Sequence, residues 1–252
     1  MFLNYHDIML LLMNIIKTLG FLFSLVLSSS VYATDFGKCN LLFPHQTPPT
    51  ITTENLNTKH TKPLCYEDFA ILYSIDSKTP VYTVERLNYL GLSQKKPKRP
   101  GKFHEEPMLS KSERSTLKDY ARSGYDRGHN APCLFRRGEV AMEQSMNLAN
   151  CMPQRKRHNE ILWAKNVERA TYNYILKRSK GDVFVFTGSY YYPTHKTIGE
   201  NHVWVPDVIW KVVDDSGGKR WVFWTKNSDD EKMSPPISYE AFVAKTGLHL
   251  LP

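Results

Sequence analysis

A single long helical pattern at residues 159–176 lies between two groups of short strand-like runs. Its apolar residues recur at helical spacing, and Gly181 follows as a stop signal. Before it, the runs at 69–74 and 81–87 are separated by a plausible turn, which predicts a hairpin. This order of strands, one long helix and further strands predicts an α+β fold with a central antiparallel sheet.

Weaker patterns complete the expected element order. A short helix is expected at 112–120 and an amphipathic stretch at 140–150. The last helix has Ser238 as its cap and Gly247 as its stop. The remaining strands are expected at 182–188, 203–206, 208–213 and 220–225, and the last helix at 237–246.

The first 33 residues are predicted to be a signal peptide. Residues 13–33 combine a basic start, an apolar centre and a small-residue end. The alternative is a membrane anchor, because residues 1–12 add further apolar side chains; no later stretch is apolar for long enough to span a bilayer. We expect an irregular arm at 34–65 and one domain at 66–252. The protein would be exported, periplasmic or secreted, with no stable membrane association after cleavage.

Four cysteines, Cys39, Cys65, Cys133 and Cys151, suggest two disulfides in an exported chain. No Cys-x-x-Cys pair occurs, so a zinc site is not expected. Of the three possible pairings we favour Cys39–Cys65 and Cys133–Cys151, because each closes a loop of modest length.

The chain has 252 residues and a formal net charge of +8. The only charges in the signal region, Asp7 and Lys17, cancel. Such a charge suits a polyanionic partner, although a basic protein without such a partner would have the same composition. The basic, proline-punctuated segment 94–102 has two interpretations, a solvated loop or a phosphate-attracting flap beside an active site.

The most specific motif is Asp126-Arg127-Gly128-His129. A neutral histidine can accept a proton near neutral pH, an arginine offers a charged fork for phosphate, and a glycine permits a backbone bend. On its own, however, His129 also fits a hydrogen-bonded loop residue. Thirty positions later, Asn159 opens the long helical pattern with an oxygen ligand, although an asparagine there can equally be a helix N-cap.

Together these motifs resemble the DNA/RNA non-specific endonucleases, the ββα-metal nucleases with a DRGH motif and a helix-borne asparagine. The resemblance covers residues 66–252 and includes further short motifs at 152–154, 163–164, 186–188 and 203–206. It implies a single domain with a ββα-metal catalytic motif. It also implies sequence-non-specific cleavage of DNA and RNA that leaves 5′-phosphates and uses a divalent cation, usually Mg²⁺ (or Mn²⁺).

Carried over to this sequence, the resemblance makes His129 the general base and Asn159 the direct metal ligand. Activity should then fall at acidic pH as the imidazole protonates. Arg86 would bind phosphate; the alternatives are an ordinary exposed strand residue or a pair with Glu85. Asp126 and Arg127 would shape the site, with Arg127 paired to a carboxylate or reaching a flanking phosphate.

The acidic residue departs from the family pattern. The family places a glutamate eight positions after the asparagine, but Val167 is there and Glu168 follows at nine. On a regular α-helix nine residues turn about 180°, which would point Glu168 away from Asn159. A π-bulge would absorb the extra residue. We therefore assign Glu168 to the site, with Glu160 and Asn166 as alternatives.

The sequence thus predicts an exported, metal-dependent endonuclease. Two other classes of protein fit parts of the pattern. One is a nucleic-acid-binding protein of the same fold that has lost catalysis, and the other is a basic exported structural or adhesive protein.

Overall fold

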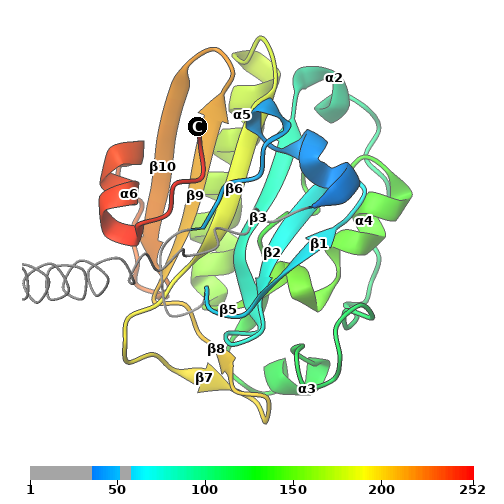
Figure 1. The fold of residues 1–252 in the computed structure, drawn as a ribbon, viewed down its shortest axis with the longest axis vertical. Helices are drawn as coiled ribbons and strands as arrows, with labels where there is room; N and C mark the ends of the chain where they lie inside the picture. Colours follow the sequence, from blue (N-terminus) through cyan, green and yellow to red (C-terminus); the bar gives the residue numbers. More distant parts are fainter. Residues whose placement is uncertain (1–35, 52–57) are drawn as a thin grey trace, which may run out of the picture. The chain divides into compact units, whose positions relative to one another are not determined.

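A computed structural model describes residues 36–51 and 58–252 of the chain, and its centre is a six-stranded antiparallel sheet (Figure 1). The signal peptide predicted at 1–33 lies outside the described residues. The strand order is β1-β2-β3-β6-β9-β10, and the predicted α+β class with a central antiparallel sheet is confirmed. The strands are β1 (Thr61–Cys65), β2 (Phe69–Ser74), β3 (Thr79–Leu87), β6 (Val183–Tyr190), β9 (Val208–Asp215) and β10 (Lys219–Lys226).

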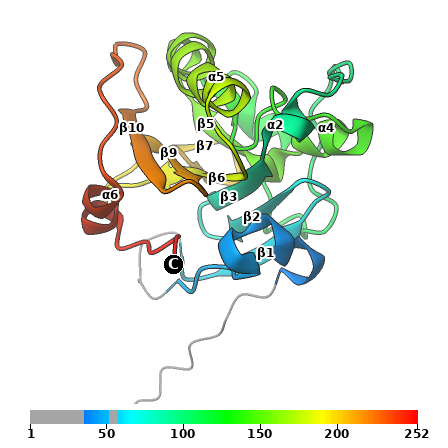
Figure 2. The same cartoon turned by 90° about the horizontal axis from the view of Figure 1, so that it is seen from above.

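The sheet separates two apolar layers, because successive side chains of a strand face opposite sides. In β9, Ile209 and Val213 pack into one layer, whereas Trp210 and Val212 pack into the other. Figure 2 shows helix α5 (Arg169–Lys177) on one side and α6 (Tyr239–Thr246) with the N-terminal 3₁₀ helices on the other. We call the side covered by α5 the helix face.

The described residues of the arm predicted to be irregular at 34–65, namely 36–51 and 58–65, are more ordered than expected. They contain two 3₁₀ helices, η1 (Gly37–Leu42) and η2 (Pro44–Gln46), and end in the edge strand β1. The side chains of Phe36 and Phe43 are buried in the layer opposite the helix face. Apolar burial therefore holds this part of the chain in place, although its several prolines, such as Pro44, Pro48 and Pro49, are typical of an irregular arm.

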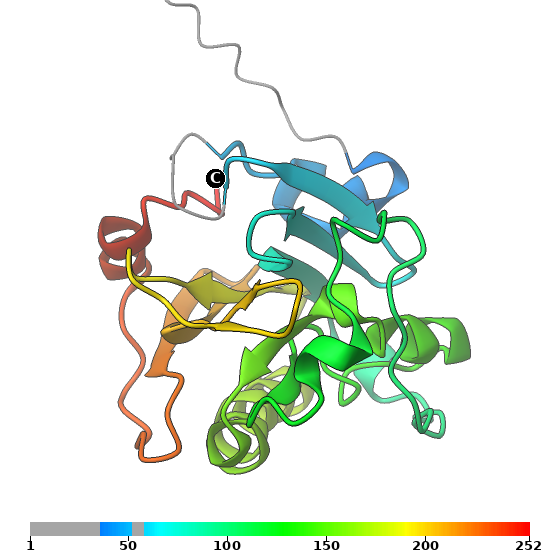
Figure 3. The same ribbon diagram turned by 90° about the horizontal axis from the view of Figure 1, so that it is seen from below.

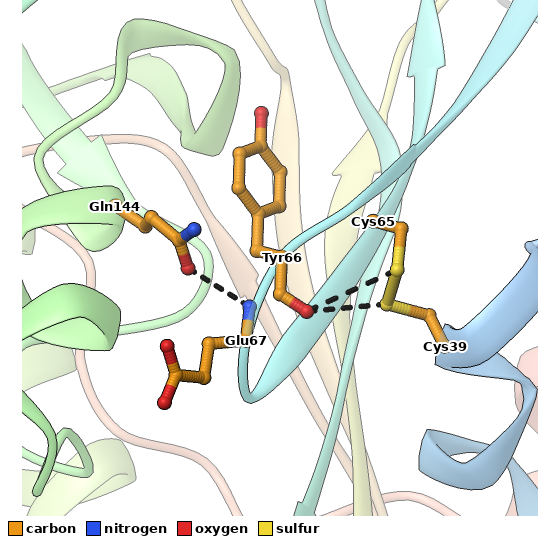
Figure 4. The surroundings of a disulfide bond; sticks show 5 residues. All are labelled: Cys39, Cys65, Tyr66, Glu67 and Gln144. Atoms are coloured by element: carbon orange, nitrogen blue, oxygen red, sulfur yellow. Dashed lines mark hydrogen bonds between the residues drawn. A yellow bond between two sulfur atoms is a disulfide. The ribbon is translucent and has the colours of Figure 1, made fainter.

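The predicted disulfide Cys39–Cys65 joins η1 to β1, with the two Cα atoms 5.6 Å apart (Figure 4). Near this disulfide, a hydrogen bond joins the residues after β1 to α4 (Glu139–Ser145): the backbone N–H of Glu67 donates to the Gln144 side chain at 2.8 Å. The disulfide closes a 26-residue separation, for which about 3 kcal/mol of stabilisation is expected.

The second predicted disulfide, Cys133–Cys151, is absent from the structure, and both thiols are buried and free. Each sulfur is directed to a different partner. The Cys151 thiol donates to the Asn147 carbonyl at 3.5 Å, while the Cys133 sulfur lies 3.4 Å from the Ser145 hydroxyl. Even parity of the cysteine count was therefore a misleading guide to pairing.

We expect alkylation of the denatured, non-reduced protein to label two cysteines, Cys133 and Cys151, and to leave Cys39 and Cys65 unmodified. Peptide mass spectrometry measures this directly, with a reduced sample as the control in which all four are labelled. A protein with no alkylated cysteine would contradict the free thiols.

The shorter elements follow the sequence patterns unevenly. The final helix has the predicted caps: the Ser238 hydroxyl accepts from the Ala241 backbone N–H at 3.2 Å, and Gly247 adopts φ 66°. The helix expected at 112–120 forms only in its last turn.

Figure 3 shows the end of the sheet next to which α3 and the β7–β8 hairpin lie. The shorter elements include α2 (Tyr89–Leu92), α3 (Leu117–Tyr120), α4 (Glu139–Ser145), η3 (Leu148–Asn150), β7 (Thr197–Ile198) and β8 (Val203–Trp204).

No helix within the described residues combines the length and apolar character needed to cross a membrane.

Candidate active site

The DRGH motif forms a short strand on the helix face of the sheet. Strand β4 (Asp126–His129) pairs antiparallel with β5 (Cys151–Gln154), and His129 lies opposite Cys151. The chain then enters the helical segment η4 (His158–Glu168), which continues into α5. Two strands followed by a helix are the ββα arrangement that the resemblance implied.

Gly128 is needed for close packing and not for the bend that we expected. It does not have a positive φ, but a Cβ there would lie 2.0 Å from the Gln154 side-chain oxygen. Gln154 is fully buried. Its amide contacts the His158 ring at 2.7 Å, and that ring contacts the Thr225 hydroxyl at 2.9 Å. This chain of contacts ties the β4–β5 pair and the start of η4 to β10.

The helix η4 is a π-helix over its whole length, His158–Glu168. At its end the backbone N–H of Arg169 donates to the carbonyl of Ala164, five residues earlier. Val167 faces the core and is fully buried, as the bulge hypothesis required. The wider turns bring Glu168 back to the face of the helix that carries Asn159.

A cavity of about 420 Å³ brings most of the predicted site residues together. Of the residues assigned from the sequence, only Arg86 is not part of its lining. Asn166, one of the alternatives to Glu168, is also outside it, whereas Glu160 is included. The lining comprises Lys96, Arg99, Phe103, Asp126, Arg127, His129, Pro132, Cys133, Leu134, Asn159, Glu160, Ala164 and Glu168.

Asn159 is oriented by the motif's aspartate. Its side-chain N–H donates to the Asp126 carboxylate at 3.0 Å, which leaves its carbonyl oxygen as the free acceptor. Asn159 does not act as the helix N-cap, because Arg157 precedes it with helical dihedrals and the Asn159 backbone N–H already donates to Arg155. The side chain is therefore available to the cavity.

These residues fit a hydrated divalent cation. The cavity presents one neutral amide oxygen with carboxylates at Asp126, Glu160 and Glu168. Mg²⁺ keeps several waters, so a few protein oxygens that also accept from those waters suit it. Within residues 36–51 and 58–252 no cluster of three or more His, Cys, Asp or Glu side chains is arranged to hold a metal directly.

His129 is partly buried and neutral. Burial, with smaller effects from Arg99, Arg127 and Arg136, lowers the pKa of His129 to about 3. Its Nε2 lies 3.7 Å from the Cys133 sulfur, and the Phe103 ring packs 5.1 Å from the imidazole centroid. The imidazole is thus unprotonated over the whole neutral range, and its own protonation does not explain a loss of activity at pH 5–8.

Glu168 has the opposite tendency. Burial raises the pKa of Glu168 to about 7, and the charges that favour its ionised form come first from Lys211, then from Arg169 and Arg99. Lys211 points from β9 into the helix face, is fully buried, and lies 5.6 Å from the centroid of the Trp163 ring. This lysine was not predicted as a site residue, because in the sequence it appears as one polar residue inside a strand.

Arg86 was assigned wrongly to the site. Arg86 lies two and four residues after Val84 and Tyr82, so its side chain is on the same side of the strand as theirs and faces the layer opposite the helix face. Its guanidinium pairs with Asp182, the Nε donating at 2.9 Å and Nη2 at 2.6 Å. The alternative pair with Glu85 is also wrong, because Glu85 is fully buried and bonds to Arg136.

The positively charged side chains that do line the cavity are those of Arg127, Lys96 and Arg99. Arg127 is exposed, and its guanidinium lies 4.6 Å from the centroid of Phe103; it pairs with no carboxylate within the described residues. Lys96 and Arg99, from the basic segment 94–102, line the cavity, which favours the flap interpretation. The signal for both was in that run of charge, but the sequence did not single out either residue.

The profile of the DNA/RNA non-specific endonuclease family matches residues 46–248. The chain belongs to this family. The match begins inside the segment expected to be an irregular arm. Among solved structures, a chain in the crystal structure of the EndoG/EndoGI complex, which concerns the mechanism of EndoG inhibition, has a TM-score of 0.66. It is 22% identical and covers 79% of this chain and 92% of its own length, which confirms the fold.

Two relatives illustrate the range of the family. Human endonuclease G, named as mitochondrial, is 31% identical over 166 residues, which are 61% of this chain and 55% of that protein. Nuclease C1 of Cunninghamella echinulata is 31% identical over 166 residues, 58% of this chain and 62% of that protein. The chain spans little more than half the length of the human and bovine endonuclease G sequences that it matches.

The expectation of an exported, periplasmic or secreted protein is contradicted by these relatives. The human and bovine endonuclease G proteins are both named as mitochondrial.

Proposed function

We propose that the chain is a divalent-metal-dependent endonuclease that hydrolyses phosphodiester bonds of DNA and RNA without sequence preference. One observation carries this proposal: His129, Asn159 and Glu168 line the same cavity despite the irregular spacing of the glutamate. The cations Lys96, Arg99 and Arg127 at the same cavity suit a phosphate substrate.

In the proposed reaction His129 takes a proton from the attacking water. The water oxygen bonds to phosphorus, and the bond from phosphorus to the 3′ oxygen breaks. The products are a 5′-phosphate and a 3′-hydroxyl, the latter protonated by solvent. Arg99 lines the cavity with His129 and Glu168, and its guanidinium would stabilise the phosphate charge.

Asn159 would hold the cation, which we propose to be Mg²⁺ (or Mn²⁺), and Glu168 would accept hydrogen bonds from its waters. The cation would supply stabilisation of the charge that develops on the phosphate and the leaving oxygen. Asp126 positions Asn159 through the 3.0 Å hydrogen bond. Arg127, resting on Phe103, would contact a flanking phosphate.

We expect the purified protein to nick and then linearise supercoiled plasmid in Mg²⁺ and to degrade RNA under the same conditions. Addition of EDTA should abolish both activities. Gel electrophoresis of plasmid and of a structured RNA measures the result. A protein that retards DNA on a gel but never nicks it would be a binding protein of the same fold, and one that does neither would favour the structural or adhesive alternative.

A further inference from the structure

A second cavity of about 620 Å³ adjoins the active-site cavity. Lys96 and Leu134 line both, so the two spaces are neighbours on the same surface. The boundary also falls between consecutive residues of one helix, since Glu168 lines the first cavity and Arg169 the second. A substrate strand that extends from the active site in this direction would therefore enter the second cavity directly.

The lining of the second cavity is basic. Lys96, Arg137 and Arg169 contribute to it, and no acidic side chain is among its described residues. Arg137 is already engaged, because it donates to backbone carbonyls of Leu92, Leu134 and Arg136. The side chains of Lys96 and Arg169 donate no hydrogen bond and form no ion pair within the described part of the chain, so both can hold an anion in this cavity.

Aromatic side chains accompany these charges. Tyr172 carries the guanidinium of Arg169 at 5.5 Å and that of Arg137 at 5.8 Å from its ring centroid. Tyr89, the first residue of α2, also lines the cavity and is 52% exposed. Its ring stacks on no other ring within the described residues. Aromatic rings on which bases can stack, beside positively charged side chains, are typical of sites that bind single-stranded nucleic acid.

We propose that the second cavity binds the nucleotide next to the scissile phosphodiester in single-stranded substrates, its phosphate held by Lys96 and Arg169 and its base stacked on Tyr89. This inference rests on the proposed function for the identity of the ligand. It adds a binding subsite that lies outside the reacting groups. Duplex substrates would use the cations but not the stacking surface, because their bases remain paired.

The test is the affinity of a fluorescein-labelled 12-nucleotide single strand, measured by anisotropy in EDTA so that no cleavage occurs. Tyr89→Ala should weaken binding about tenfold, and Tyr89→Phe, which keeps the ring, should bind as the wild type does. Arg169→Gln should weaken binding and lower the slope of log Kd against log salt by about 0.7, the share of one phosphate contact. The matched control is Arg178→Gln at the C-terminal end of α5, outside this lining, which should leave affinity and slope unchanged.

The same variants are then compared on a 12-base-pair duplex, where Tyr89→Ala should change the affinity less than twofold. Wild-type affinity of both Tyr89→Ala and Arg169→Gln for the single strand would overturn the inference. An equal loss on duplex and single strand for Tyr89→Ala would overturn it as well. Failure of the proposed function would show separately, as a wild-type protein that binds in EDTA but does not cleave in Mg²⁺.

Discussion

His129→Ala should lower the rate of DNA cleavage by about 10²–10⁴-fold, the usual contribution of a general base. The imidazole is neutral across the physiological range because burial and nearby arginines depress its pKa, so no bound proton blocks this role at neutral pH. The rate is measured with a fluorescent oligonucleotide at saturating Mg²⁺, and binding of the same oligonucleotide in EDTA should be nearly unchanged.

A suitable control is His249→Ala, because His249 is exposed and its neighbours Leu248 and Leu250 pack in the layer opposite the helix face. Both variants should melt close to the wild-type temperature. If His129→Ala keeps more than a tenth of the wild-type rate, another group accepts the proton.

Glu168→Gln should lower kcat by about 10–100-fold, as loss of a carboxylate that orients the metal's surroundings typically does. A neutral amide cannot accept hydrogen bonds from two waters as a carboxylate can. Glu160→Gln is the matched comparison, since Glu160 lines the same cavity but is exposed. A larger loss for Glu160→Gln would transfer the role to Glu160.

The pH profile separates the two catalytic groups. Glu168 is an acid with a raised pKa of about 7, so it gains a proton and loses its charge as pH falls through that value. Wild-type activity should therefore decline below about pH 7, and the midpoint should move to lower pH as Mg²⁺ is increased, because a nearby cation favours the ionised form. Glu168→Gln should have no such decline down to pH 5. An unchanged midpoint in Glu168→Gln would exclude this carboxylate as its source.

The sequence was most informative where local pattern and chemistry agree. The helical pattern at 159–176, the hairpin of β2 and β3, and the caps Ser238 and Gly247 are properties of neighbouring residues. The irregular turn before Glu168 was also predictable, because the motif required a glutamate near Asn159 and a regular helix could not supply it.

The predictions that were wrong or incomplete depend on the three-dimensional arrangement of residues that are distant in the sequence. Strand β3 is buried on both faces except at Arg86, so no alternation revealed which layer that arginine faces. Cysteine pairing depends on distant side-chain directions, and Cys133 and Cys151 have other partners. Lys96 and Arg99 could be grouped as a basic run, but only the fold shows which of its charges meet the cavity.

The π-helix also has a consequence for how related chains are recognised. Asn159 is held in register by Asp126 on one side of η4, and Val167 is held by the sheet core on the other. The wide turns let these two anchors stay in place while the chain between them gains a residue. A motif search that fixes the asparagine–glutamate interval at eight would classify this sequence as a degenerate member without its acidic group. Sorting active from inactive members by sequence therefore requires a one-residue gap at this point of the helix.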